Sequence, residues 1–124
     1  MRGVIREVGL AWRIKATHLL QEYFNVLHAY RGREKKETFP DPRGAVIRDL
    51  NDIQRSDIII VNDTMPNVSM IGTSMEIFWA NQLKKIIIVF GREHEKDYFF
   101  DYHIHTRTST LEEACKLVIR MFKN

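Results

Sequence analysis

The chain has 124 residues, a usual length for one domain, and 44% of them are hydrophobic, which is enough to form a buried core. Its formal charge of +3 is modest, and the 19 basic residues are interleaved with 16 acidic ones, which argues against a nucleic-acid polymer as the ligand. No apolar run approaches the roughly 18 residues of a membrane span, and the first residues lack the apolar stretch of a signal peptide, so we expect a cytoplasmic protein with no membrane partner.

Apolar spacing predicts the secondary structure in chain order. The expected helices cover 10–28, 45–55, 73–83 and 111–122, and the expected strands cover 57–61, 86–90 and, as a shorter element, 103–106. A polar loop at 31–43 and a charged and aromatic loop at 92–101 separate these elements. The last helix carries the single cysteine, Cys115, which we interpret as a small buried hydrophobe.

Helices that alternate with continuous apolar strands are typical of a parallel sheet covered on both faces. We therefore predict one α/β domain over 1–124, doubly wound and flavodoxin-like or Rossmann-like, with about four or five strands. Ligands of such sheets bind beyond the carboxyl ends of the strands. This rule directs attention to 62–76, the segment that joins the first strong strand to its helix.

Two carboxylates are candidates for chemistry. Thr73 and Glu76 have the spacing of a capping box, in which Glu76 reaches back to the helix backbone, and Thr110 and Glu113 repeat this spacing before the last helix. The functional interpretation of Glu76 rests on its position, because a carboxylate in the first helical turn after a central strand faces the usual ligand crevice. Asp49, on an amphipathic helix, is by itself more typical of a solvated or capping residue.

Three short motifs, taken in order, resemble the nucleoside 2-deoxyribosyltransferase family, including the related 2'-deoxynucleoside 5'-phosphate N-hydrolases. That family has an Asp-Leu-Asn-like helix motif, a Ser-Asp pair that opens a buried strand, and a Gly-x-x-x-Glu helix start. The corresponding residues here are 49–51, 56–57 and 72–76. The resemblance runs from about Trp12 to the C-terminal helix.

The resemblance implies a mechanism and assigns residues to it. Glu76 would attack the anomeric carbon of a 2-deoxyribosyl group, and the glycosyl-enzyme ester would pass to another base or to water. The family's helix aspartate contacts the base and helps protonate it as it leaves, a role that maps onto Asp49. The resemblance also implies a small-molecule nucleoside or nucleotide substrate, no cofactor, no metal, and a homodimer or higher homo-oligomer in which a neighbour completes each site.

Two features depart from the family pattern. The family opens with a strand carrying a Tyr-Leu-Ala-Gly-Pro-like motif, whereas this chain begins inside it, so either that first strand is missing or 4–8 takes its place. Near the position where the transferases have a sugar-binding aspartate, this chain has Ser69, a neutral residue that tolerates a phosphate dianion. Ser69 therefore resembles the N-hydrolases, and Arg2 and Gly3 fall where those enzymes have an Arg-Gly phosphate loop.

The remaining candidates are polar residues near the predicted crevice. Asp63 follows the first strong strand and could bind substrate or form a turn, and Gly72 belongs to the loop that runs into the helix of Glu76. His103 and His105 would share one strand face, but no further ligands stand at a recognisable spacing, so we expect no metal site. Three functions stay open: a transferase, a 5'-monophosphate hydrolase, and a nucleotide-binding module without turnover.

Overall fold

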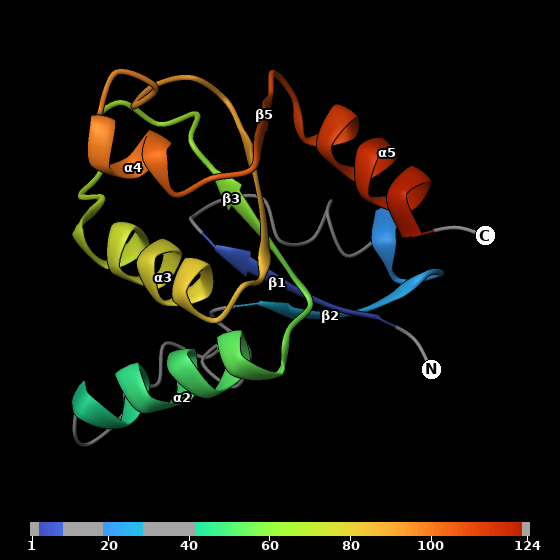
Figure 1. Ribbon diagram of the computed structural model, residues 1–124, viewed down its shortest axis with the longest axis horizontal. Helices are drawn as coiled ribbons and strands as arrows, with labels where there is room; N and C mark the ends of the chain where they lie inside the picture. The colour runs from blue at the N-terminus through green and yellow to red at the C-terminus, as the bar shows by residue number, and fades with distance from the viewer. Residues whose placement is uncertain (1–2, 9–18, 29–41, 123–124) are drawn as a thin grey trace.

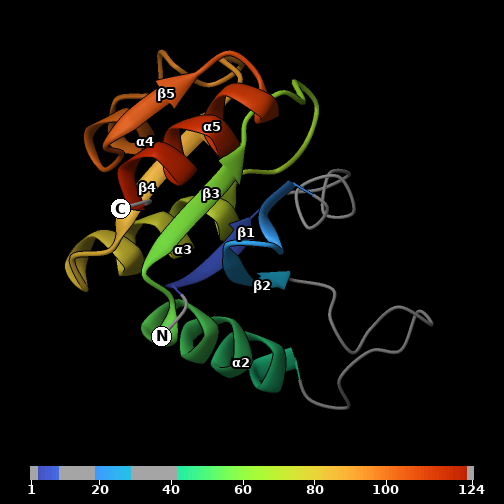
Figure 2. The same ribbon diagram turned by 90° about the vertical axis from the view of Figure 1, so that its right-hand side faces the viewer.

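The structure is a computed structural model that describes residues 3–8, 19–28 and 42–122. Five strands form one parallel sheet in the order β2-β1-β3-β4-β5 (Figure 1 and Figure 2). The strands are β1 (Gly3–Val8), β2 (Phe24–His28), β3 (Ile58–Asn62), β4 (Ile86–Phe90) and β5 (Thr106–Thr108), and the helices are α2 (Pro42–Arg55), α3 (Ile71–Gln82), α4 (Tyr98–Tyr102) and α5 (Leu111–Phe122). The predicted flavodoxin-like or Rossmann-like α/β fold is thus confirmed.

Helices cover both faces of the sheet: α2, α3 and α4 lie on one face and α5 lies on the other (Figure 1). Alternate residues of β3 serve the two faces, because successive side chains of a strand point in opposite directions. Ile58 and Ile60 pack in the core beneath α5, whereas Ile59 and Val61 pack beneath α2 and α3. This two-sided burial explains the uninterrupted apolar runs of β3 and β4. No helix in the described part of the chain is long and apolar enough to cross a membrane.

The strand β1 lies in the interior of the sheet, between β2 and β3. Residues 4–8, which the sequence analysis considered as a substitute for the family's first strand, therefore do form a strand. Asp57 secures it at one end, because its carboxylate accepts a hydrogen bond from the Val4 amide at 2.7 Å and its own amide donates to the Val4 carbonyl at 2.7 Å.

The helix expected over 10–28 is wrong at its end, where the chain forms the edge strand β2. Residues 9–18 lie outside the described part of the chain, and the described helical turn before β2 covers Leu19 and Leu20. The error has a physical cause: Leu20 and Phe24 are both buried beneath α5, and short apolar runs fit helical and extended spacing equally well. Pairing with β1 decides in favour of the strand.

Three boundaries also differ from the predicted ones. Helix α2 begins at Pro42, a residue suited to a first helical turn, and β5 begins at Thr106 after a loop that contains the short helix α4. Helix α3 begins at Ile71 with Met70 as its N-cap and with no capping side chain. Glu76 therefore lies in the second turn, and the predicted capping box does not form. At α5, by contrast, the Thr110 hydroxyl accepts a hydrogen bond from the Glu113 amide at 3.2 Å.

Candidate functional site

Glu76 and Asp49 meet at one buried arginine. The Nη2 atom of Arg6 donates to Oδ1 of Asp49 at 3.0 Å and to Oε2 of Glu76 at 3.3 Å. The three residues come from three elements and are 43 and 70 positions apart in sequence. The side chain of Arg6 is 0% exposed, whereas those of Asp49 and Glu76 are 23% and 17% exposed. Two carboxylates that solvent can reach thus lie above a cation that it cannot reach.

The fold explains why these side chains converge. Arg6 stands two residues before Val8 on β1, so both side chains point to the same face of the sheet. Val8 packs beneath α2 and α3, and these two helices also contact each other. Asp49 lies on α2 and Glu76 on α3, so the seam between the two helices brings both carboxylates over Arg6.

Arg6 is a buried cation in contact with two acidic side chains. One guanidinium, which is always protonated in proteins, faces two carboxylates. Within the described residues, the Nε and Nη1 atoms of Arg6 are buried and have no hydrogen-bond partner. Buried donors without partners are rare and often mark a functional site or an ordered water. Arg6 was not predicted from the sequence; the available signal was a charged residue between the apolar residues of the short segment 4–8.

Asp63 is buried and bonds to other side chains of the protein, so it does not face a crevice. Its side chain is 0% exposed; Oδ1 contacts Nδ1 of His94 at 2.6 Å, and Oδ2 accepts from the His94 amide at 2.9 Å and from Nη1 of Arg107 at 2.7 Å. Arg107 also donates hydrogen bonds to the Gly91 carbonyl at 2.7 Å and to the Asp101 carboxylate at 2.9 Å. These contacts join the ends of β3, β4 and β5, so the turn role foreseen for Asp63 fits better than substrate binding.

The other predicted site residues divide between the two ends of the sheet. Ser69 is exposed just before α3, where its hydroxyl accepts from the Ile71 amide at 3.4 Å, and Gly72 is exposed in the first turn with no atom within 4 Å of an added Cβ. Both follow β3 at the carboxyl edge. Gly3 opens β1 at the amino edge, so the structure does not bring it to Ser69 and Gly72. Arg2 lies outside the described residues.

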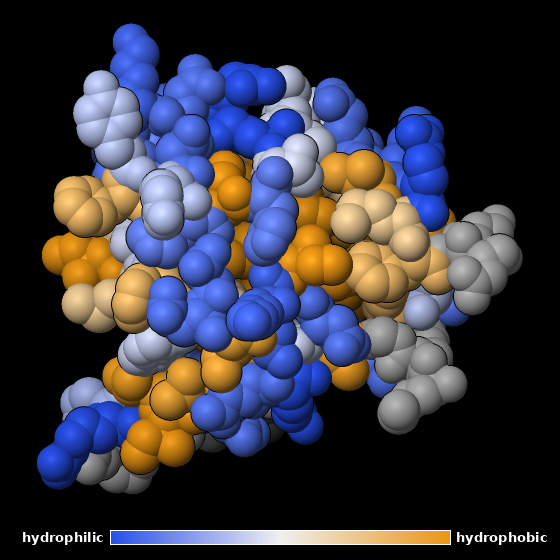
Figure 3. Space-filling model, viewed as in Figure 1, coloured by the Kyte–Doolittle hydropathy of each residue, from blue (hydrophilic) through white to orange (hydrophobic). Residues whose placement is uncertain are grey.

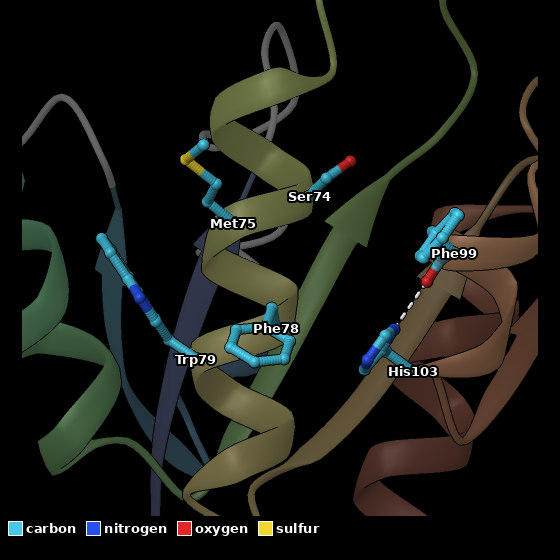
Figure 4. A pocket seen from close by; sticks show the side chains of 6 residues that line it. All are labelled: Ser74, Met75, Phe78, Trp79, Phe99 and His103. Atoms are coloured by element: carbon cyan, nitrogen blue, oxygen red, sulfur yellow. Dashed lines mark hydrogen bonds between the residues drawn. The ribbon is translucent and has the colours of Figure 1, made fainter.

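An apolar hollow, which the sequence analysis did not foresee, lies between α3 and α4 (Figure 4). It has a volume of about 230 Å³ and is lined by Ser74, Met75, Phe78, Trp79, Phe99 and His103. Phe78 lies between Trp79 and His103, with its ring centroid 5.6 Å from that of His103 (Figure 4). A second hollow of about 300 Å³ shares Phe99 and His103 and adds Tyr98 and Tyr102. Orange side chains gather around α3 on the left of Figure 3.

Neither histidine of the predicted pair stands in a cluster of ligands. His103 contacts the Phe99 carbonyl through Nδ1 at 2.6 Å, and His105 accepts a hydrogen bond from the Ile87 amide through Nδ1 at 3.0 Å. In the ranges 3–8, 19–28 and 42–122, no group of three or more His, Cys, Asp or Glu residues could hold a metal ion.

The chain is similar to known proteins in structure but matches none of them in the two sequence comparisons. No family model and no curated protein matches the chain. Among solved structures, the chain resembles the Clostridium botulinum CMP N-glycosidase BcmB with a TM-score of 0.61, over 93% of this chain and 97% of that chain, at 17% sequence identity. At this identity the likeness establishes the fold alone: the chain has the architecture of that N-glycosidase, a parallel five-stranded sheet between layers of helices.

Proposed function

We propose that this protein cleaves the N-glycosidic bond of a nucleoside 5'-monophosphate or nucleoside, with Glu76 as the nucleophile and Asp49 beside it. The observation that carries this proposal is the convergence of the two carboxylates on Arg6 with part of each left exposed. The sequence resemblance selected the same two residues without knowledge of their contact. The likeness of the fold to a CMP N-glycosidase supports the same reaction class.

The chemistry follows from the ionised carboxylate of Glu76. One of its oxygens attacks the anomeric carbon, a bond forms between that oxygen and C1', and the bond from C1' to the base nitrogen breaks. The electron pair of the broken bond leaves with the base. In the second step an acceptor attacks C1' and releases Glu76, so one hard displacement becomes two easier ones.

Asp49 is the group placed to act on the leaving base. A base leaves more readily when it is protonated, and a carboxyl group close to the nucleophile can pass it a proton. Because Arg6 contacts Asp49, that proton must first reach Asp49 from solvent. One oxygen of each carboxylate lies within hydrogen-bonding distance of the same nitrogen atom, at 3.0 and 3.3 Å, so the two groups are neighbours. Neighbouring carboxyl groups suit a two-step course in which one attacks the sugar and the other serves the leaving base.

The substrate that we favour carries a phosphate. Ser69 and Gly72 stand at the start of α3, where backbone amides and the helix dipole favour an anion. A hydroxyl and a glycine place no negative charge there that would repel a phosphate. Water is the favoured acceptor, since a CMP N-glycosidase shares the fold; transfer to a second base is the alternative. We also propose a homodimer, as the sequence resemblance implies.

The test is an assay of base release and base exchange. The protein is incubated with ribo- and deoxynucleosides and their 5'-monophosphates, with and without a second base, and the products are separated by chromatography. We expect free base from a monophosphate without an acceptor; exchange that requires an acceptor would assign the transferase instead. Glu76→Gln should abolish turnover, whereas the matched control Glu22→Gln, at an exposed position beside β2, should not. Ligand binding without any turnover would assign a binding module and overturn the proposal.

A further inference from the structure

Arg6 occupies a position where the sheet would ordinarily have an apolar side chain. Its neighbours on the same face are Val8, Ile59 and Val61, and it is itself fully buried. A charge in such surroundings carries a large desolvation cost, which ion pairing offsets only when the geometry is good and the remaining donors are satisfied. Among the described residues, Nε and Nη1 of Arg6 have no such partner. Stability of the fold therefore does not account for this residue.

The contacts of Arg6 point to the two carboxylates as the reason for its presence. Both bond to the same atom, Nη2, and part of each side chain is exposed. Two carboxylates so close together repel each other, and repulsion favours protonation of one of them. A buried cation between them reverses that tendency. A protonated Glu76 could not act as a nucleophile.

We propose that Arg6 is a positioning residue: it keeps Glu76 ionised before substrate binds and fixes the separation of Glu76 from Asp49. This inference rests on the proposed function. Arg6 itself touches no substrate and acts through the two carboxylates. Asp52, the further buried acid of α2, has its own partner in Arg55 at 3.6 Å.

Arg6→Met tests the inference, because methionine fills a similar volume without charge. Removing one member of an ion pair leaves its partners without that contact, and the cost is smaller when solvent can reach the partners, as it can reach Asp49 and Glu76. We expect a folded variant with a Tm lower by about 10 °C or less, a kcat lower by about 10²–10³-fold, and the acid limb of the kcat–pH profile moved upward by about 1–3 pH units. Arg92→Met, the same substitution at an exposed arginine whose partner Glu95 is also exposed, should leave all three unchanged.

Arg6→Lys separates charge from geometry. One ammonium group restores the positive charge, so the acid limb should return towards its wild-type position, but it does not reproduce the planar guanidinium and kcat should stay reduced. Wild-type kcat and an unmoved acid limb in Arg6→Met, together with loss of activity in Glu76→Gln, would overturn the inference and leave the proposed function standing. Unfolding of both variants would assign Arg6 to folding and likewise overturn it.

A second readout is independent of turnover. Side-chain carboxyl carbons of Glu76 and Asp49 are followed by ¹³C NMR against pH in the wild type and in Arg6→Met, and Glu76→Gln and Asp49→Asn identify the signals. Midpoints that rise in Arg6→Met support the inference, and midpoints that stay overturn it. If the wild type releases no base from any substrate, the proposed function fails, and this titration still decides the role of Arg6.

Discussion

At the level of single side chains, Asp49 and Glu76 have distinguishable roles. Asp49→Asn should lower kcat for an ordinary nucleotide by about 10²–10⁴-fold, because the leaving base loses its proton donor. The loss should be far smaller for 7-methylguanosine 5'-monophosphate, whose base is already cationic and leaves without protonation. Turnover of both substrates by Asp49→Asn and by Glu76→Gln measures the difference. Glu76→Gln should lose activity on both substrates. If Asp49→Asn loses equal activity on both substrates, Asp49 is not the proton donor to the base.

Asp63 gives a prediction about stability. In Asp63→Asn the guanidinium of Arg107, whose side chain is 8% exposed, loses its buried carboxylate. Breaking one partner of a buried ion pair costs about 3–5 kcal/mol, so the free energy of unfolding measured in urea should fall by roughly that amount. Asp101→Asn is the matched control, because it removes the exposed partner of the same arginine and should cost about 1 kcal/mol or less. Similar losses in the two variants would contradict the role assigned to Asp63.

The candidate site could be predicted from sequence only in part. Glu76 and Asp49 followed from short motifs at the right intervals, and the structure brings them together. The role of Arg6 could not be predicted in this way. In a short strand, residue spacing alone does not show which charged side chain faces the interior, because that depends on the neighbouring strands and helices. Asp63 was correctly placed at the end of β3, but its partners His94 and Arg107 lie 31 and 44 residues further on and no local pattern links them.

Among the elements, the turn after β4 depends on Gly91. Its φ of +96° is unfavourable for any other residue, and an added Cβ would lie 2.3 Å from the Asp63 carbonyl oxygen. Gly91→Ala should therefore lower the free energy of unfolding by more than the about 1–3 kcal/mol of backbone strain alone. In the matched control Gly72→Ala, the new Cβ meets nothing within 4 Å, and a helical alanine should raise stability by up to about 1 kcal/mol. Denaturant unfolding of both variants checks the opposite signs.

The elements that the sequence predicted well are those with strong and continuous patterns. The strands β3 and β4 are buried on both faces, and α5 keeps its apolar residues at helical spacing. In these elements the local sequence pattern favours the same secondary structure that burial in the fold requires. The edge strand β2 was predicted as helix, because its identity depends on pairing with β1 and not on its own residues. Helix α4 has five residues, Tyr98–Tyr102, and its N-cap is Asp97, whose side chain accepts hydrogen bonds from the Phe99 and Phe100 amides. Such a short helix leaves no periodic signal.

Across the chain as a whole, the face formed by α3 and α4 remains to be explained. Its exposed side chains include Phe78, Tyr98, Phe99 and Tyr102, of which the last three are more than 80% exposed. Contiguous apolar surface of this kind usually marks an interface, and aromatic side chains contribute most to interface energy. We therefore expect the homodimer that the sequence resemblance implies to form through this face.

Sedimentation velocity over a range of concentrations tests this assignment. The double variant Phe99→Ser/Tyr102→Ser should raise the dimer dissociation constant by about 10²–10³-fold, since two central aromatics at about 2 kcal/mol each contribute about 4 kcal/mol together. Its Tm at low concentration should not change, because both side chains are exposed in the single chain. Met121→Ser, at a 48% exposed apolar residue of α5 on the opposite side of the sheet, is the control and should leave dimerisation intact. A monomeric wild type at every concentration would dismiss the dimer. A dimer that only Met121→Ser disrupts would place the interface on α5, and the α3–α4 face would then need a different partner.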